Sequence, residues 1–416
     1  MKVAKIAAVT LLLFTAILGL GYWALATAAN TFTTRELVRA DAQWRREFAR
    51  AKPRIENDVT LLIENPIYTD RARLKNAEPV IRKFLTWDGD KSGSAPEGLE
   101  FENETKIKAF ANRHPLKDLT AKSWRAILDD PELAQLKLAW LDDLISSDHF
   151  DMATHPSHQQ AIEEAKTANG LEKIEISSSL PMPNFALLRA MAAFRYAQLV
   201  SKGKPDEASE LFRHTSHLIW TSNSLVGSMT AMSMLKIEHA LEAAGAGFTL
   251  PLVENERIEA MRSLSWFWGG TYRHLLIGDY FSPLKPYFTP ETGACAGASE
   301  SLTGSSGFEM FFGGESSWME PDFTAAFKRV RRTEERLMHM CSMEAYRPFF
   351  ESPPAKAAPL FVKNVYVVSE SLGDMQIPNP TLIPFVRRAA GASLLSIAMP
   401  NPFAVYDKRD REPASK

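Results

Sequence analysis

The chain of 416 residues has two cysteines and almost no net charge, and both shortages limit what it can do. Two cysteines allow at most one internal disulfide. Lysine and arginine total 48 against 50 aspartate and glutamate, so the net charge of −2 gives no long-range attraction to nucleic acid or anionic lipid. With 45% hydrophobic and 24% charged residues, the composition is that of a globular protein with a full core.

Motifs that identify common enzyme classes are also missing. The sequence has no G-x-S-x-G nucleophile elbow, no Walker loop, no dinucleotide fingerprint and no H-E-x-x-H pair. The one basic cluster, residues 328–336, interleaves its basic residues with threonine and glutamate, which is typical of a solvated helix face. We therefore expect neither a recognisable catalytic set nor a nucleic-acid partner.

Residues 6–30 contain no charged side chain, which is the strongest signal in the sequence. A run of this length crosses a bilayer as one helix, and Tyr22 and Trp23 stand where aromatic residues mark the membrane interface. We predict a signal-anchor helix at residues 1–30 that contacts the membrane through residues 6–29. The alternative is a cleaved secretory signal, with a small-residue cleavage site near residues 24–28.

Both alternatives export the rest of the chain. Lys2 and Lys5 precede the apolar run, while Arg35, Arg39 and Arg45 follow it, so the flanking charge is nearly balanced. Long downstream domains cross a membrane largely regardless of such charges. We therefore expect a single-pass protein of the cytoplasmic (inner) membrane whose bulk faces the periplasm or the exterior. A body that faces the cytoplasm is the other arrangement.

From residue 34 onward apolar residues recur every three or four positions, which predicts amphipathic helices. The sequence thus predicts a mainly α fold, with helices packed as αα-hairpins and little β structure. We divide it into an N-terminal helical region (31–180), a central hairpin region (181–290), a flexible Gly/Ser loop (291–320) and a C-terminal helical region with a tail (321–416).

The clearest helix pair lies at residues 184–223. Asn184 is placed to cap the first helix, Gly203 to end it, and Pro205 to begin the second. Each helix carries one apolar stripe, at positions 185, 188, 192, 196 and 199 and at positions 208, 211, 215 and 218. The pair resembles a tetratricopeptide-type helical hairpin, but no second copy recurs at a fixed period.

The two cysteines, Cys295 and Cys341, form an even pair. In an oxidising compartment such a pair predicts a disulfide that closes a long loop. Because Cys341 lies in an apolar helical segment, two separate buried thiols are the alternative.

The acidic stretch DGDKSG scans as the start of a calcium loop. Asp88, Asp90 and Ser92 take positions one, three and five, where calcium needs oxygen ligands, and Gly93 takes position six. Position twelve is Leu99, where that loop needs a bidentate glutamate. Since these residue types also suit any exposed turn, the alternative is an ordinary surface loop. Apart from this ion we predict no cofactor.

A histidine-rich segment offers ligand types that suit zinc, but its spacing does not force them to converge. These residues are Asp148, His149, Asp151, His155 and His158. Two further histidines, His214 and His217, align with glutamates on the polar face of their predicted helix, so we expect them at the surface.

Residues 371–380, SLGDMQIPNP, are similar to the segment that follows the catalytic glutamate of peptidoglycan lytic transglycosylases. That resemblance implies an exported, largely helical hydrolase whose acid begins a Glu-Ser pair on a helix. The pair at residues 351–352 is followed by two prolines, which block such a helix, and Asp374 replaces an apolar position of the motif. An envelope hydrolase would otherwise depend on scattered acids such as Glu351 or Asp148.

Together these features favour a membrane-anchored, exported helical protein that serves as a protein-interaction or structural component of the cell envelope, with a protein partner. An exported envelope hydrolase is the alternative. A calcium-stabilised domain without catalysis is the third hypothesis.

Overall fold

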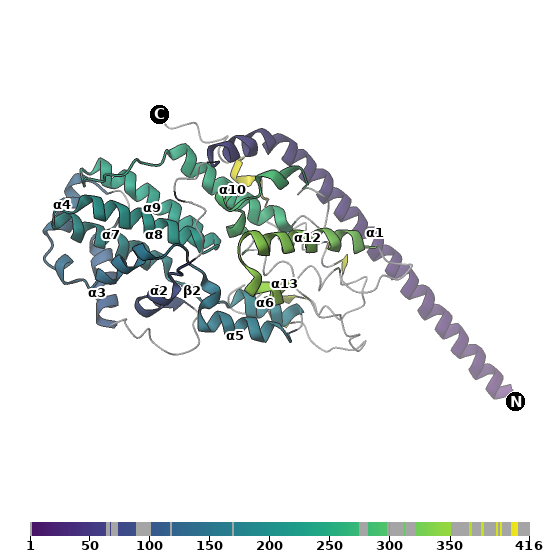
Figure 1. The fold of residues 1–416 in the computed structure, drawn as a ribbon. Helices are drawn as coiled ribbons and strands as arrows, with labels where there is room; N and C mark the ends of the chain where they lie inside the picture. Colours follow the sequence, from purple (N-terminus) through teal and green to yellow (C-terminus); the bar gives the residue numbers. More distant parts are fainter. Residues whose placement is uncertain are drawn as a thin grey trace.

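Figure 1 shows a computed structural model of the chain. It describes residues 2–63, 67, 74–88, 101–116, 119–168, 170–273, 282–297, 299, 312, 322–350, 366–367, 376–377, 388–389, 392 and 401–406.

Helices make up most of the described chain. In chain order they are α1 (Lys2–Leu61), α2 (Glu78–Phe84), α3 (Phe101–Arg113), α4 (Ala121–Asp129), α5 (Pro156–Ala165), α6 (Gly170–Ser178), α7 (Phe185–Ser201), α8 (Pro205–Thr221), α9 (Leu225–Ala243), α10 (Asn255–Arg273), α12 (Thr324–Met340) and α13 (Arg347–Phe350). Short 3-10 helices add η1 (Leu133–Gln135), η2 (Ala139–Ser146), η3 (Met152–Thr154), η5 (Ser282–Tyr287), η6 (Pro290–Thr292) and η7 (Glu344–Tyr346).

Strands are short and occur as two antiparallel pairs within these residues. β1 (Trp87–Asp88) pairs with β2 (Met182–Pro183), and β3 (Tyr366–Val367) pairs with β4 (Gln376–Ile377). The prediction of a mainly α protein with little β structure is confirmed.

The hairpin of α7 and α8 forms where its capping residues predict it. The Asn184 side chain accepts a hydrogen bond from the Leu187 N–H at 2.9 Å and caps α7. Gly203 takes a φ of 75°, a left-handed conformation that costs glycine little, and Pro205 begins α8. α9 then packs against α8, so consecutive helices stack as predicted hairpins.

Helix α7 is buried on nearly all sides, more than its predicted stripe requires. The stripe residues are buried, and so are Leu187, Met191 and Phe194 on other faces of the helix. The reason is that α3, α4, η1 and η2 pack on the face that α8 and α9 leave open. α7 is therefore the centre of the core and not a two-sided surface helix.

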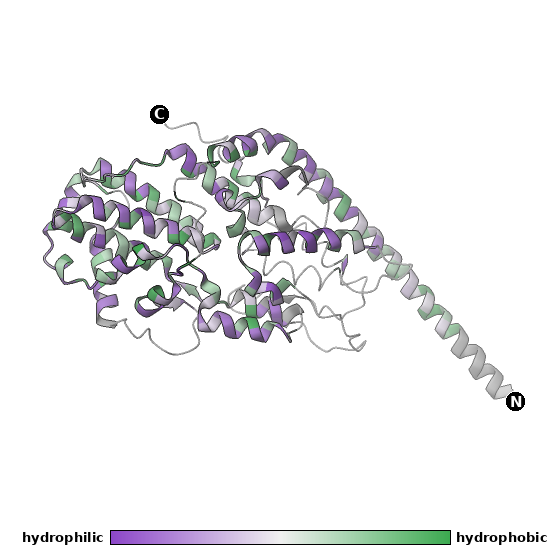
Figure 2. Cartoon of the chain, in the orientation of Figure 1, coloured by the Kyte–Doolittle hydropathy of each residue, from purple (hydrophilic) through white to green (hydrophobic). Residues whose placement is uncertain are grey.

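Helix α1 has two halves in different surroundings. Side chains from Leu13 to Leu25 are exposed, and Figure 2 shows this segment in green and pale tones as it leaves the body. Among the described residues α1 is the one helix long and apolar enough to cross a membrane; a single-pass anchor and a signal sequence both fit it.

The second half of α1 packs on the body through one stripe. Most of its buried positions are spaced by 3, 4, 7 or 11 residues, which places them on one helix face: Ala26, Thr33, Trp44, Ala51, Ile55, Asp58 and Val59. Buried Thr33 donates its hydroxyl to the Ala29 carbonyl at 2.8 Å, so its polar group is satisfied within the helix.

From Trp44 onward, α1 docks on α10 and on residues 401–406. Phe403 packs edge-on against Trp44, with ring centroids 5.1 Å apart, and also contacts Phe267 of α10 at 5.8 Å. The Arg54 guanidinium donates to the Tyr406 carbonyl at 3.1 Å. A segment near the C-terminal end thus wedges between two helices from distant parts of the sequence.

Cys295 and Cys341 are joined by a disulfide, with Cα atoms 5.4 Å apart. Both are almost fully buried, and the side-chain amide of Asn223, in the turn between α8 and α9, donates to the Cys341 carbonyl at 2.9 Å. The bridge therefore ties the Cys295 segment and the end of α12 to the α8–α9 hairpin.

The first residues of the predicted Gly/Ser loop are not a loop. η6 ends at Thr292, and residues 294–297 are helical. A Cβ on Gly293 or Gly297 would lie 2.3 Å from the Ser265 hydroxyl or 2.6 Å from the Gly269 nitrogen. Small residues here allow close packing on α10, which composition alone cannot distinguish from flexibility. Most of residues 298–320 lie outside the described residues.

Removing the disulfide tests how much the closed loop stabilises the body. The two cysteines are 46 residues apart, and in the chain-entropy model closing such a loop stabilises the folded state by about 4 kcal/mol. We expect Cys295→Ala with Cys341→Ala to lower the free energy of unfolding by about that amount in urea melts. Wild-type protein melted in reductant should match the double variant. An unchanged midpoint in both would contradict a structural disulfide.

Candidate binding groove

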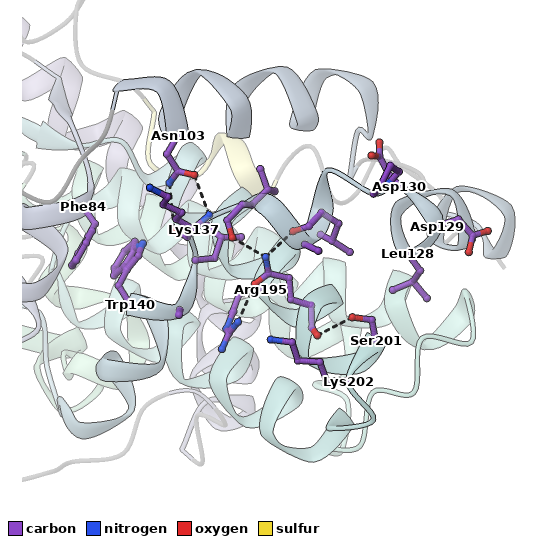
Figure 3. Close-up of a pocket in the computed structure, with 17 residues that line it drawn as sticks. Phe84, Asn103, Leu128, Asp129, Asp130, Lys137, Trp140, Arg195, Ser201 and Lys202 are labelled. Carbon is purple, nitrogen blue, oxygen red and sulfur yellow. Dashed lines mark hydrogen bonds between the residues drawn. The ribbon is translucent and has the colours of Figure 1, made fainter.

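A groove of about 610 Å³ lies between η1, η2 and the C-terminal end of α7, within the size range of ligand pockets. The ends of α2, α3 and α4 complete its walls, as the lining residues in Figure 3 show. The groove exists because residues 131–146 run alongside α7 as short 3-10 turns. Such turns leave more open space beside α7 than a continuous helix would.

Two polar residues of α7 hold these turns in place. The Gln198 amide donates to the carbonyls of Leu133 at 2.7 Å and Leu136 at 2.9 Å, and its oxygen accepts from Arg195. Arg195 in turn makes a two-bond ion pair with Asp142 of η2. Arg195 is the buried member of this pair, with 8% of its side chain accessible, while 46% of the Asp142 side chain is accessible.

One end of the groove is aromatic. The rings of Phe84 and Trp140 stack with centroids 4.8 Å apart and planes 11° from parallel. Near them the side-chain amide of Asn103 donates to the Lys137 carbonyl and accepts from the Lys137 N–H. This fixes the Lys137 backbone at the groove wall.

The rest of the lining carries both signs of charge: Lys137 and Lys202 stand against Asp129 and Asp130, while Arg195 is paired with Asp142. Lys137 and Lys202 have exposed side chains, and Figure 3 shows Lys202 beside Arg195 on one side of the groove. Asp130 points away from them and is engaged by His114 at 2.9 Å. That hydrogen bond, followed by one from the Glu132 N–H, lowers the pKa of Asp130. Besides the aromatic pair, Lys137 and Lys202 offer cationic partners to a carboxylate.

The described lining residues include no histidine, cysteine or glutamate. General acid–base catalysis most often uses such groups, and the aspartates of the lining lie at its rim. The arrangement supports binding more directly than a reaction.

These groove residues were missed in the sequence because they lie on a helix that is otherwise apolar. The signal was present: Arg195, Gln198 and Lys202 stand at i, i+3 and i+7 of α7, which is one helix face. Polar residues at that spacing on a core helix mark a face that must find polar partners.

The histidines of residues 148–158 serve the fold. His158 is buried, its two ring nitrogens hydrogen-bonding the Tyr346 hydroxyl and the Pro181 carbonyl, both at 2.7 Å. His155 caps α5 and stacks on Trp87 with centroids 4.0 Å apart. Within the described ranges no group of three or more histidine, cysteine, aspartate or glutamate side chains is placed to hold a metal ion.

Asp148 is also structural. Burial opposes ionisation of its carboxyl, but hydrogen bonds from His149 and from the N–H groups of Leu74 and Lys75 outweigh that effect and lower its pKa to about 2. A carboxylate held this firmly ionised is poorly suited to donate a proton as a general acid. It fixes the segment before α2. Glu351, the other acid considered for a hydrolase, lies outside the described residues.

The prediction that His214 and His217 lie at the surface is wrong. His214 hydrogen-bonds the carbonyls of Leu144 and Ser147, and His217 those of Ile67 and Asp148. The polar face of α8 is covered by η2, whose turns leave carbonyls that need donors. The histidines therefore satisfy buried backbone groups.

The predicted calcium loop is described only at its start. Asp88 is exposed and lies in β1, where it pairs with Met182. The helix before it, α2, already ends at Phe84. Asp90 and Ser92 lie outside the described residues, so calcium binding stays a prediction.

The buried His158 predicts a loss of stability in mild acid. Burial is the main cause that lowers its pKa from 6.5 to about 4, with His155 lowering it further while Asp151 and the Pro181 carbonyl raise it. The unfolded chain therefore binds the proton more readily than the folded one. Stability is full above pH 6.5 and falls as the pH decreases toward 4, by about 2 kcal/mol between pH 7 and pH 5.

Urea melts at pH 7 and pH 5 check this expectation. We expect the pH dependence in that interval to be smaller in His158→Gln than in the wild type, whatever the variant's stability at pH 7. An equal pH dependence in both proteins would show that His158 titrates normally.

In comparisons with known proteins, no family model, no curated protein and no solved structure matches the chain.

Proposed function

We propose that this protein is a single-pass protein of the cytoplasmic membrane that holds a helical body on the outer side and binds a protein partner through the groove. α1 is its uncleaved anchor. The groove residues Lys137, Lys202, Phe84 and Trp140 contact an extended partner segment that carries an apolar side chain and an acidic group.

The observation that carries the proposal is the contrast between the halves of α1. Ile17 and Leu20 are 65% and 66% exposed, which is costly for apolar side chains in water and favourable in lipid. The same helix continues without interruption into the docked half. A signal cleaved near residues 24–28 would cut where packing against the body begins at Ala26.

The disulfide supports the outer location. Disulfides persist in oxidising compartments and are rare in the cytosol, where thiols are kept reduced. A structural bridge between Cys295 and Cys341 fits a body that is exported across the membrane.

The groove supports a binding role because its polar contacts are already made within the protein. Arg195 and Gln198 hold its walls, so the surface is formed before a partner arrives. A preformed site spares the entropic cost of ordering on binding.

Two arginines in the apolar half of α1 test the anchor. We expect Ile17→Arg with Leu20→Arg to release the protein from membranes under an alkaline wash, since each arginine near the centre of a span costs about 3 kcal/mol of insertion. The matched control is Val38→Arg, at a position 63% exposed on the docked half of α1, which should stay in the membrane fraction. Equal retention of all three proteins would contradict a spanning α1.

Protease added to spheroplasts tests the side of the membrane in the same preparations. We expect the added protease to digest the body of the wild type from outside. The intact wild-type protein should have an N-terminus at Met1 or Lys2. A body that is protected until the membrane is broken faces the cytoplasm, and a new N-terminus near residues 24–28 identifies a cleaved signal.

A photo-crosslinking side chain in the groove tests the partner site. We expect benzoylphenylalanine at position 134, on the groove wall, to form one defined protein adduct in living cells. At the exposed position 226 of α9, outside the groove, it should form none. Reversing both charges, Lys137→Glu with Lys202→Glu, should reduce the adduct several-fold. Adducts that are equal at both positions, or insensitive to charge, would reject the groove as the binding surface.

A further inference from the structure

The anchor and the body share one helix with no linker between them. α1 runs from Lys2 to Leu61 as a single element. Side chains are exposed from Leu13 to Leu25, which is 64% accessible, while Ala26 is 2% and Thr33 is 0% accessible. Ala26 is therefore the first buried position on the side of the helix that faces the body.

The length of the apolar segment before Ala26 matches the hydrocarbon thickness of a bilayer. Residues 6–25 span about 30 Å as a helix, which is the thickness of a typical hydrocarbon core. All of these residues are needed to cross the hydrocarbon core of the bilayer. The first residue beyond that core, Ala26, is already packed against the body. The body must then begin at the lipid surface.

The docked half is held firmly enough to set an orientation. Its stripe packs on α10 and Phe403, and its far end is tied by the hydrogen bond from Arg54 to Tyr406 and by one from the Tyr287 hydroxyl to Glu56. These named contacts extend over about 18 Å of helix between Trp44 and Glu56. Contacts distributed over that length resist rotation of the body about the anchor.

The groove lies far from the lipid in this arrangement. Figure 1 places α3, α4 and the adjoining end of α7, which form its walls, at the end of the body opposite the free end of α1.

We propose that α1 clamps the body directly against the lipid surface in one orientation and so presents the groove at the membrane-distal end. This inference rests on the proposed spanning role of α1. The interacting surface is the end of the body around Ala26–Thr33, its partner is the lipid surface, and the groove is directed to a segment that lies beyond the reach of lipid.

Energy transfer to headgroup-labelled lipids in nanodiscs tests the clamp with the full chain. A donor dye is attached to a cysteine at Val38 or at Ala134, while the native cysteines stay bridged. Val38 lies about 20 Å along the helix from Leu25. We expect efficient transfer from Val38, weak transfer from Ala134, and a narrow distribution of single-molecule efficiencies at both sites.

Two insertions between Leu25 and Ala26 form a matched pair, and neither alters the core. A helical insert of seven residues should move both dyes about 10 Å farther from lipid and keep the distributions narrow. A seven-residue Gly/Ser insert should broaden the distribution at Ala134 at least two-fold, because the body is then free to rotate. If the Gly/Ser insert leaves both distributions unchanged, or if Ala134 transfers as efficiently as Val38, the clamp is wrong.

Fluorescence quenching of Trp23 by brominated lipids separates this result from the proposed function. The quenched component should be present in all three proteins and absent in Trp23→Phe. Loss of that component in the wild type would reject the spanning helix itself. Its presence together with unchanged distributions would reject the clamp alone.

Discussion

The packing of one stripe of α1 on α10 and residues 401–406 is the contact on which the proposed membrane arrangement depends. In that proposal the same helix meets two solvents, with its apolar segment in lipid and its amphipathic segment packed on the body. Because a helix without a break transmits its direction, the docking of Trp44 against Phe403 also sets the direction of the exposed segment. Stability of the body and the proposed geometry at the membrane thus depend on one set of contacts.

The candidate groove forms because polar side chains on the buried helix α7 need hydrogen-bond partners. A helix surrounded by core has no water for its polar side chains, so Arg195 and Gln198 bind the turns of η1 and η2. Those turns in turn leave carbonyls that a regular helix would have paired. The cavity, its cationic side and its aromatic end follow from short turns packed on a core helix.

Histidines play a similar part on the other side of η2. His158 and His217 each use both ring nitrogens on partners in irregular segments or turns, which are the Tyr346 hydroxyl and the carbonyls of Pro181, Ile67 and Asp148. Asp148 supplies the complementary acceptor for backbone N–H groups of residues 74–75. These histidine and aspartate side chains, which are also common metal ligands and catalytic groups, here hydrogen-bond irregular backbone. Counting possible ligands in the sequence does not reveal this role.

The sequence by itself determined the local structure: the apolar run of α1, the α7–α8 hairpin with its cap at Asn184 and turn at Gly203, and the helical class of the fold. These depend on periodicity and on conformational preferences that act within a few residues. Tertiary structure decided which helix lies at the centre, that His217 is buried and His214 binds backbone carbonyls, that residues 294–297 form a tight helix on α10, and that residues 401–406 bind α1. These outcomes depend on which faces meet across hundreds of residues, and a face has the same sequence pattern whether protein, lipid or water covers it.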